Sequence, residues 1–240
     1  MGNFFSSYLN ELGCVNLETG EFPGPFLTIS RQPGCSAQRI AIKLSKILTG
    51  YSYMSETNTG TEWKWVDKSV FANVTLAMVD EVKAGAYDDA NEVIRSLTAL
   101  AKAFADDSIY DISDKKQIIT LKSIICRLAN QGHTIIVGRS AGALLRNIPN
   151  KLNIRLEAQK EWRTHRLMQM RDMSWAQAET YINEADKKRD SFIEKVIGRK
   201  ANNNDFDVIF NYAALEDDYI VDAVINMLKN KKIIACPNDD

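Results

Sequence analysis

The sequence predicts an α/β fold, in which a parallel sheet is covered by helices on both faces. Segments with helical periodicity separate short apolar, β-branched runs, and such alternation is typical of parallel sheets. The composition, 45% hydrophobic and 25% charged, is that of an ordinary globular protein. The clear strand candidates are residues 26–29, 134–138, 152–156 and 206–210. A weaker candidate lies at residues 65–66 or, alternatively, at 51–54.

The chain of 240 residues has the length of a single domain. Residues 1–25 form a poorly periodic N-terminal arm that ends in a Pro-Gly-Pro turn. The helix-rich block at about residues 68–130 is longer than a simple crossover needs, and acidic, turn-prone stretches at 84–91 and 103–111 break it into several helices. We expect a small helical subdomain here, at the carboxyl ends of the strands, where ligands bind in open α/β sheets.

Charge and cysteine content exclude several classes of function. The chain has 30 basic and 31 acidic side chains, so its net charge of -1 disfavours bulk nucleic-acid binding, although local basic clusters can hold a small anion. Four scattered cysteines and two histidines provide neither a disulfide framework nor a structural metal site, which fits a reducing cytosol. No apolar run approaches the roughly 20 residues that span a bilayer. We therefore expect a cytoplasmic protein without a membrane partner, whose oligomeric state the sequence leaves open.

The segment from the first strand into the next helix has features of a phosphate-binding loop. Small side chains around Gly34 would let backbone N–H groups converge on an anion, at a helix start that is partly positive. The pattern G-x-x-x-x-G-K-[ST] fails, however, because Arg31 and Ser36 stand at the glycine positions and Ala37 at the lysine position. From this segment alone, a phosphate loop and an ordinary strand-to-helix turn are equally good interpretations. The candidate residues are Ser30, Arg31, Gly34, Cys35, Ser36, Ala37, Gln38 and Arg39.

A second strand ends in a glycine and an arginine, Gly138 and Arg139, and enters a helix through small residues. An arginine at the mouth of a parallel strand is well placed to hold a phosphate with two hydrogen bonds. The alternative is an arginine on a surface loop.

A third group of arginines lies on a predicted helix that begins at Ser174 with a capping box to Gln177. At about 100° per residue, Arg189 falls in the middle of the apolar stripe of this helix and Asp186 at its edge. Arg189 is therefore either buried in an ion pair with Asp186 or directed at an anion. Arg163 and Arg166 are three residues apart and can address one ligand together. So many guanidinium groups suggest several phosphates.

These motifs, in this order and spacing, resemble the cytidylate kinase-like family of nucleoside monophosphate kinases from about residue 26 to 228. The resemblance implies a three-layer P-loop kinase-like fold: a five-stranded parallel sheet flanked by helices, with a helical segment that binds the nucleoside monophosphate and a lid at about residues 160–200. It also implies transfer of the γ-phosphoryl group from ATP to CMP or a similar acceptor, with Mg²⁺ as the cofactor and small-molecule nucleotides as the partners.

The resemblance assigns a role to each motif. Residues 30–39 would form the phosphate-binding loop, and Asp67, Lys68, Gly138 and Arg139 would lie on the acceptor side. The catalytic groups would be Arg139, Arg163, Arg166 and Arg189. Phosphoryl transfer needs positioning and charge neutralisation more than a covalent nucleophile, so this set of residues fits the chemistry.

The loop departs from the family pattern. The lysine expected at Ala37 is missing, and Arg39 replaces a threonine that helps to hold Mg²⁺. Arg39 or Arg31 could supply the missing charge. Three functions stay open: a nucleotide kinase, a catalytically silent nucleotide-binding module that acts through a partner, and a scaffold whose arginines are all paired. The base specificity and the true phosphate acceptor are not indicated.

Other side chains favour ordinary interpretations over functional ones. The four tryptophans at positions 63, 65, 162 and 175 could stack a base, but core packing is favoured. Cys35 suggests a redox switch at a helix start, yet a small filler residue is the preferred interpretation. His165 lies between two arginines, which oppose its protonation, and is expected on the surface rather than as a general base.

Overall fold

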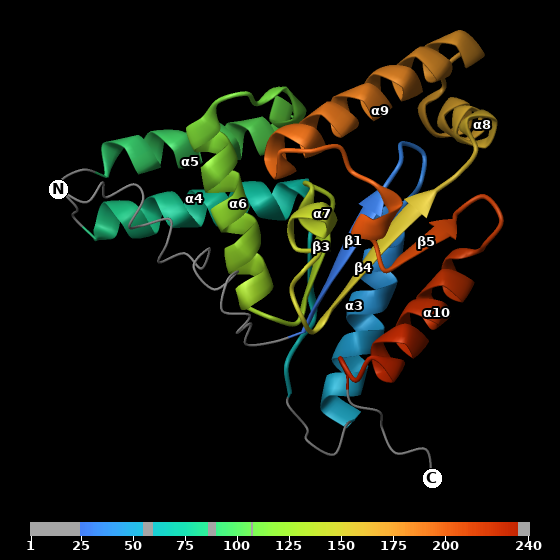
Figure 1. The fold of residues 1–240 in the computed structure, drawn as a ribbon, viewed down its shortest axis with the longest axis horizontal. Helices are drawn as coiled ribbons and strands as arrows, with labels where there is room; N and C mark the ends of the chain where they lie inside the picture. The colour runs from blue at the N-terminus through green and yellow to red at the C-terminus, as the bar shows by residue number, and fades with distance from the viewer. Residues whose placement is uncertain (1–24, 55–59, 86–89, 107, 235–240) are drawn as a thin grey trace.

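The computed structural model describes residues 25–54, 60–85, 90–106 and 108–234. At its centre is a five-stranded parallel sheet in the order β2-β3-β1-β4-β5 (Figure 1). The predicted three-layer α/β fold is thus confirmed. The predicted N-terminal arm, residues 1–25, lies outside these ranges except for Pro25. The strands are β1 (Phe26–Arg31), β2 (Lys64–Val66), β3 (Thr134–Val137), β4 (Lys151–Glu157) and β5 (Val208–Asn211).

Two strand predictions need correction. Residues 51–54 are helical, and the strand that pairs with β3 is β2, so the alternative at 65–66 was right. β5 begins at Val208 rather than at residue 206, because the N–H of Phe206 donates to the Asn203 carbonyl oxygen of a preceding 3-10 helix.

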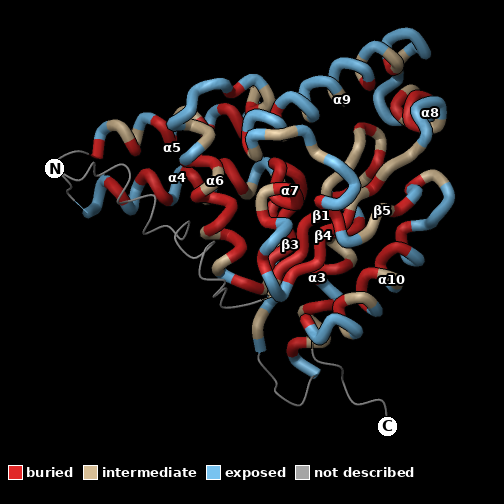
Figure 2. Tube along the Cα trace, viewed as in Figure 1, coloured by how far each residue is buried: buried red, intermediate tan, exposed pale blue. Residues whose placement is uncertain are grey.

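One face of the sheet is covered by α3 (Ala37–Met54) and α10 (Asp217–Asn230). Alternate residues of each strand point to this face, since side chains along a strand alternate between the two faces. Leu27 and Ile29 of β1 and Ile154 of β4 pack here against Leu44 of α3 and Val224 of α10. The buried sides of both helices form one core with the sheet (Figure 2).

The opposite face carries the helix-rich block. Phe26 and Ile136 point to this face and pack in the same core as Phe71, Leu97 and Ile124 of the helices. The block is divided into several helices, as predicted: α4 ends at Ala84 and α5 at Ala105, each within one of the two acidic stretches. The elements are α4 (Lys68–Ala84), α5 (Asn91–Ala105), the short 3-10 helix η2 (Ser108–Asp111), α6 (Lys115–Asn130) and α7 (Ala141–Leu144).

A helical hairpin crosses the carboxyl ends of the strands (Figure 1). Its members are α8 (Lys160–Arg171) and α9 (Trp175–Ile197), followed by the 3-10 helix η3 (Asn203–Asp205). The predicted capping box of α9 is present, with Ser174 and Gln177 bonded reciprocally. Most of the hairpin is exposed, but Phe192 and Val196 near the end of α9 are buried against the helix-rich block (Figure 2). Within the described residues, no helix is both long and apolar enough to cross a membrane.

Candidate functional site

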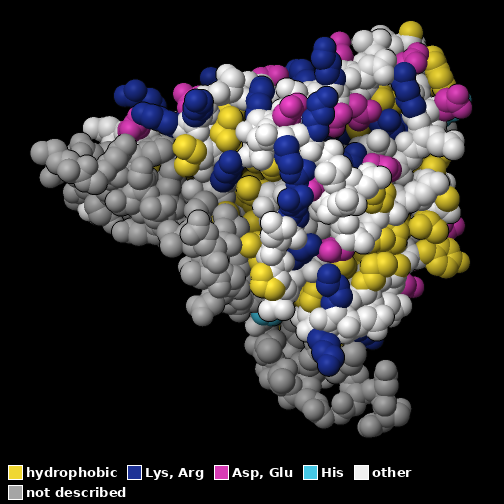
Figure 3. Space-filling model, in the orientation of Figure 1, with side chains coloured by type: hydrophobic (Ala, Val, Ile, Leu, Met, Phe, Trp, Pro, Cys, Tyr) yellow, Lys and Arg dark blue, Asp and Glu magenta, His cyan; other side chains and the backbone are white. Residues whose placement is uncertain are grey.

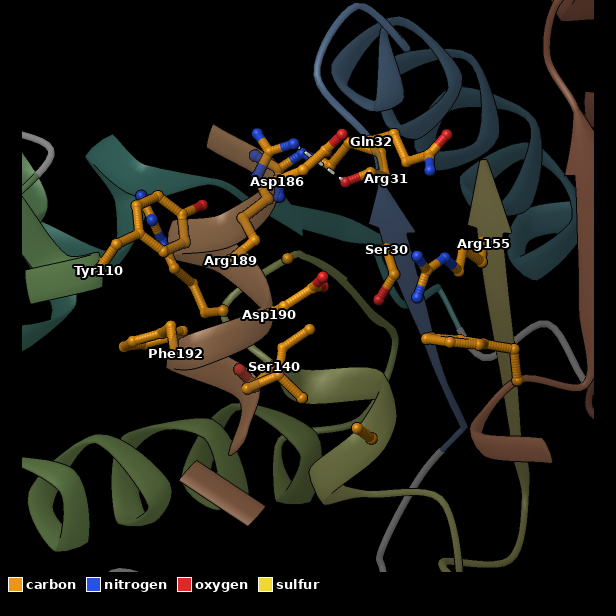
Figure 4. Close-up of a pocket in the computed structure, with 15 residues that line it drawn as sticks. Ser30, Arg31, Gln32, Tyr110, Ser140, Arg155, Asp186, Arg189, Asp190 and Phe192 are labelled. Atoms are coloured by element: carbon orange, nitrogen blue, oxygen red, sulfur yellow. Dashed lines mark hydrogen bonds between the residues drawn. The ribbon is translucent and has the colours of Figure 1, made fainter. Parts of the chain in front are cut away.

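A small cavity, of about 50 Å³, lies where β1 and β3 end beneath α9 (Figure 4). We call it the inner cavity; Ser30, Arg31, Tyr110, Arg139, Arg189 and Asp190 are among its lining residues. It adjoins an outer cavity of about 370 Å³, which shares Arg31, Tyr110, Arg139 and Arg189 with it. These are the strand ends at which open α/β sheets bind their ligands.

The turn between β1 and α3 is folded on itself. The N–H groups of Cys35, Ala37 and Arg39 donate to the carbonyl oxygens of Gln32, Cys35 and Ser36, with N···O distances of 3.2, 3.1 and 3.1 Å. Gly34 has φ +90°, and a Cβ added there would lie 3.3 Å from Cβ of Arg163. Three of the amides expected to cradle a phosphate are therefore used inside the loop, and the positive charge beside it comes from side chains.

Cys35 is a buried filler of this turn. Burial raises the pKa of its thiol to about 11, and the charges of Arg163, Arg166 and Arg189 offset only part of that effect. A thiol with this pKa stays protonated at neutral pH, which argues against the redox switch and agrees with the preferred interpretation.

The turn after β3 has a left-handed backbone at three successive positions. Gly138, Arg139 and Ser140 have φ values of +80°, +57° and +62°, a conformation that costs energy for residues with a Cβ. Gly138 makes room for Arg31: a Cβ at Gly138 would lie 1.8 Å from Nη1 of Arg31. The glycine thus lets the guanidinium group of Arg31 cross from the end of β1 to the end of β3.

Arg139 is buried, with 3% of its surface exposed, so the interpretation as a surface arginine is wrong. Its guanidinium carbon lies 5.5 Å from the ring centre of Phe104 and 5.3 Å from that of Tyr110. The aromatic faces, which are partly negative, stabilise a positive charge that burial alone would disfavour.

Arg189 reaches the same place from α9. Its Nη1 donates to the carbonyl oxygen of Arg31 at 3.2 Å, and its guanidinium carbon lies 6.0 Å from the Tyr110 ring centre. Asp186 instead pairs with Arg163, with 2.9 Å between Nη1 and Oδ2. Of the two alternatives for Arg189, the structure therefore favours a side chain directed at the cavity.

Arg163 and Arg166 lie on the other side of the loop. Arg163 is buried, and besides Asp186 its Nε donates to the Ala158 carbonyl oxygen at 3.0 Å. Arg166 stacks on the rings of Trp162 and Tyr212 at 5.0 and 5.2 Å. Its Nη2 donates to Oγ of Ser36 at 3.2 Å. The predicted arginines thus fall into two groups, separated by the loop.

Arg166 borders a third space, the α3–α10 cavity, of about 520 Å³. Arg39 lines it too, but its Nε pairs with Oδ2 of Asp217 at 2.8 Å and 63% of its side chain is exposed. Trp162 and Tyr212 meet edge to face at 5.9 Å at this wall.

The predicted acceptor residues are only partly brought together. Lys68 lines the outer cavity with Arg31 and Arg139, and Gly138 lines the inner cavity. Asp67 caps α4, where its Oδ1 accepts from the N–H groups of Ser69 and Val70. The outer cavity has one acidic lining residue, Glu184, against six basic ones, which are Arg31, Lys68, Arg139, Arg171, Lys188 and Arg189.

Tyr110 was missed by the sequence reasoning. It belongs to η2. Burial tends to raise the pKa of its hydroxyl group, but the positive charges of Arg139, Arg31 and Arg189 outweigh this effect, so the net pKa lies below the usual value. The signal in the sequence was weak: two aromatic residues, Phe104 and Tyr110, in a stretch that otherwise has the acidic composition of a turn.

The other aromatic predictions are mostly confirmed. Trp63 is a core residue, and Trp65 and Trp162 pack against the same core. Trp175 is different, because it is 39% exposed and meets the exposed His165 edge to face at 4.9 Å. His165 lies on the surface, as expected.

A family model supports the resemblance that the motifs suggested. The model of the cytidylate kinase-like family matches residues 26–214, which is most of the chain. The chain belongs to the cytidylate kinase-like family. With the three-layer fold described above, it is a nucleotide kinase-like module.

Comparison with solved structures gives one match that supports the fold and a weaker one that does not bear on it. An uncharacterized protein from Eubacterium ventriosum ATCC 27560 superposes with a TM-score of 0.58 at 17% identity, over 87% of this chain and 99% of that chain. Shikimate kinase from Bacteroides thetaiotaomicron has a TM-score of 0.41 at 12% identity, over 86% of this chain and 96% of that chain. Among curated proteins, no match was found.

The family implies Mg²⁺ with ATP, and the inner cavity has side-chain oxygens for only part of the coordination of such an ion. Mg²⁺ usually takes one or two carboxylates together with water and phosphate oxygens. Asp190 and Ser30 both line the cavity, and their side chains extend into it (Figure 4). In the described part of the chain, no group of three His, Cys, Asp or Glu side chains could hold a metal alone. A Mg²⁺ ion here would depend on nucleotide phosphates for most of its ligands.

Proposed function

We propose that this cytidylate kinase-like protein transfers the γ-phosphoryl group of ATP to CMP or a similar nucleoside monophosphate. One observation carries the proposal: Arg31, Arg139 and Arg189, from the end of β1, the turn after β3 and α9, converge on one cavity at the strand ends. Three guanidinium groups from remote segments form the kind of pre-arranged positive site that a phosphate and its transferring group need.

The basic inner and outer cavities are proposed as the acceptor side. Their positive charge is local, since the chain as a whole is nearly neutral. On the face shown in Figure 3, lysine and arginine side chains gather along a band down the middle of the molecule. An acceptor phosphate bound by Arg139 and Arg189 would lie within reach of a phosphoryl group held beside the loop.

The α3–α10 cavity is proposed as the donor side. The loop separates it from the inner cavity, and Arg166 links its wall to Ser36 of the loop. Arg166, which stacks on Trp162 and on the buried Tyr212, is placed to bind the phosphates of ATP. Bound Mg²⁺ would supply neutralisation of the phosphate charge. The chain's own arginines would orient the two phosphates in line and exclude water between them.

Arg31, rather than Arg39, is proposed to replace the missing lysine. Arg39 points to the α3–α10 cavity and is paired with Asp217. Arg31 lines both cavities on the acceptor side, and its guanidinium group lies over Gly138. A charge at that place stands between the loop and the acceptor phosphate, where charge develops during transfer.

A coupled assay of ADP release tests the proposal. Purified protein with ATP and Mg²⁺ is offered CMP, UMP, AMP and GMP, and at least one acceptor is expected to raise ADP release well above ATP alone. Arg31→Ala should lower kcat/KM by on the order of a hundredfold, because one pre-arranged charge is lost. Arg39→Ala should cost much less, and Arg95→Ala, an exposed arginine of α5, should change nothing. If no acceptor stimulates ADP release, the protein is not a nucleoside monophosphate kinase.

A further inference from the structure

The ring of Tyr110 contacts two guanidinium groups. The guanidinium carbons of Arg139 and Arg189 lie 5.3 and 6.0 Å from its centre, and that of Arg139 also lies 5.5 Å from the centre of the Phe104 ring. The four side chains form one group of two rings and two cations. We call this group the Tyr110 stack. No role assigned above to the phosphate-binding residues accounts for the two rings.

The stack joins parts of the chain that are remote in sequence. Phe104 belongs to α5, Arg139 to the turn after β3, Tyr110 to η2 and Arg189 to α9. Tyr110 is also fixed from the side by Phe192, whose ring meets it edge to face at 5.3 Å. Figure 4 shows Tyr110 and Arg189 side by side at the cavity, with Phe192 below them. The ring thus has neighbours on several elements.

The physical effect of the ring is to let two like charges share one cavity wall. Two guanidinium groups repel each other and lose hydration when they are buried together. The partly negative faces of an aromatic ring attract both cations, and a rigid ring fixes their orientation at little cost in conformational entropy. Without the ring, each arginine would regain rotamers that point away from the cavity.

We propose that the ring of Tyr110 is a positioning group, which holds Arg139 and Arg189 at the spacing that the acceptor phosphate requires. The proposal deepens the proposed function and rests on it for the identity of the acceptor, although the anion-binding part stands by itself. The larger effect is assigned to the ring, which both cations contact, although Arg189 also forms a hydrogen bond with the hydroxyl group. Tyr110 therefore controls affinity for the acceptor and leaves affinity for ATP to the other side of the loop.

Two substitutions at this position separate the ring from the hydroxyl group. Tyr110→Phe keeps the ring, and Tyr110→Leu removes it. In the full-length protein, binding of CMP and of inorganic phosphate is measured by isothermal titration calorimetry without ATP. We expect Tyr110→Phe to stay within about threefold of the wild type and Tyr110→Leu to weaken both affinities about tenfold, which is a factor that corresponds to about 1.4 kcal/mol. In steady-state kinetics, KM for CMP should rise in the same proportion while KM for ATP stays unchanged.

A control separates this role from simple loss of packing. Leu228→Ala removes a fully buried side chain of α10, in the core on the opposite face of the sheet. It should lower the thermal midpoint at least as much as Tyr110→Leu and leave phosphate and CMP affinity as in the wild type.

Three results would overturn the positioning role: wild-type protein that binds neither phosphate nor CMP, unchanged affinity in Tyr110→Leu, or equal loss of affinity for ATP and for the acceptor. Failure of the kinase proposal looks different. In that case phosphate and CMP bind in a ring-dependent way, but no ADP is released from ATP.

Discussion

The guanidinium group of Arg31 packs directly against the backbone of Gly138. The guanidinium group occupies the space that any Cβ at position 138 would take, and the glycine is also in a left-handed conformation. A substitution at this position therefore acts on the site in two ways, through backbone strain and through displacement of Arg31.

Gly138→Ala is predicted to weaken binding of inorganic phosphate by about tenfold, because Arg31 is pushed out of the cavity. The matched control is Gly198→Ala at the end of α9, where φ is +76° and nothing lies within 4 Å of the added Cβ. Both variants should lose about 1 kcal/mol of stability from the strained backbone. Calorimetric titration with phosphate distinguishes them, and equal affinity in the two variants would show that Arg31 is not part of the anion site.

At the residue scale, the sequence indicated where the Arg189 side chain is directed better than it indicated the partner of Asp186. Helical periodicity placed Arg189 in an apolar stripe, and the structure has it directed at the cavity. The same periodicity suggested Asp186 as its partner, whereas Asp186 pairs with Arg163 of α8, 23 residues away. Periodicity gives the face of one helix, and a partner on another helix is set by packing that no local pattern contains.

At the scale of elements, Asp205 of η3 links the segment that follows α9 to the segment that follows α7. The buried carboxylate of Asp205 accepts from Arg146 at 3.1 Å and from Arg199 at 3.0 Å, and from the N–H of Asn202 at 3.0 Å. Burial tends to raise the pKa of this group, but these hydrogen bonds and charges outweigh it and lower the pKa to about 2. The next residue, Phe206, lies 5.1 Å from the guanidinium carbon of Arg155 at the inner cavity.

Asp205→Asn is predicted to lower the free energy of unfolding by roughly 1–3 kcal/mol at pH 7, because the arginines lose a charged acceptor. The folded-state pKa is depressed, so the contribution is complete above the ordinary aspartate pKa of 3.8 and is lost as the pH falls toward about 2. Urea titrations from pH 7 to pH 2 should show the difference between wild type and variant shrinking below pH 4. An exposed control, Asp80→Asn, should change stability little at any pH. A constant difference for Asp205→Asn down to pH 2 would contradict the assignment.

The elements show where sequence patterns are informative. The capping box of α9 and four strand candidates were predicted because they depend on neighbouring residues alone. The weakest candidate, β2, has three residues and gains its identity from pairing with β3. Tyr110 escaped prediction for the same reason, since its contact with two arginines depends on η2 lying beside α9.

At the scale of the whole molecule, the arginines contact different ends of one loop, Arg189 at Arg31 and Arg166 at Ser36. The outer cavity is mostly basic, whereas the α3–α10 cavity has three basic and three acidic lining residues. The order of motifs along the chain predicted the family and the sheet, because the order of elements is a property of the sequence. The division of the arginines into two groups could not be predicted, because it depends on how α8 and α9 cross the strand ends. The two sites are proposed to take ATP and the acceptor at the same time.

Simultaneous binding predicts that ATP and CMP together raise the thermal midpoint more than either nucleotide alone. At a hundred times each dissociation constant, one ligand adds about 2.7 kcal/mol, which is roughly 5–10 °C for a chain of this length. Adenosine and cytidine, which lack phosphates, should have little effect. An equal shift with the nucleosides would show that the arginines do not contribute to binding.

The central claim is that Arg31, Arg139 and Arg189 together hold the phosphate of the acceptor. A crystal structure of the protein with CMP tests it most directly. We predict that the 5′-phosphate lies in the inner cavity, within hydrogen-bond distance of the guanidinium groups of these three residues and beside the ring of Tyr110. A phosphate bound instead in the α3–α10 cavity beside Arg39 and Arg166, or an inner cavity that excludes CMP altogether, would contradict it.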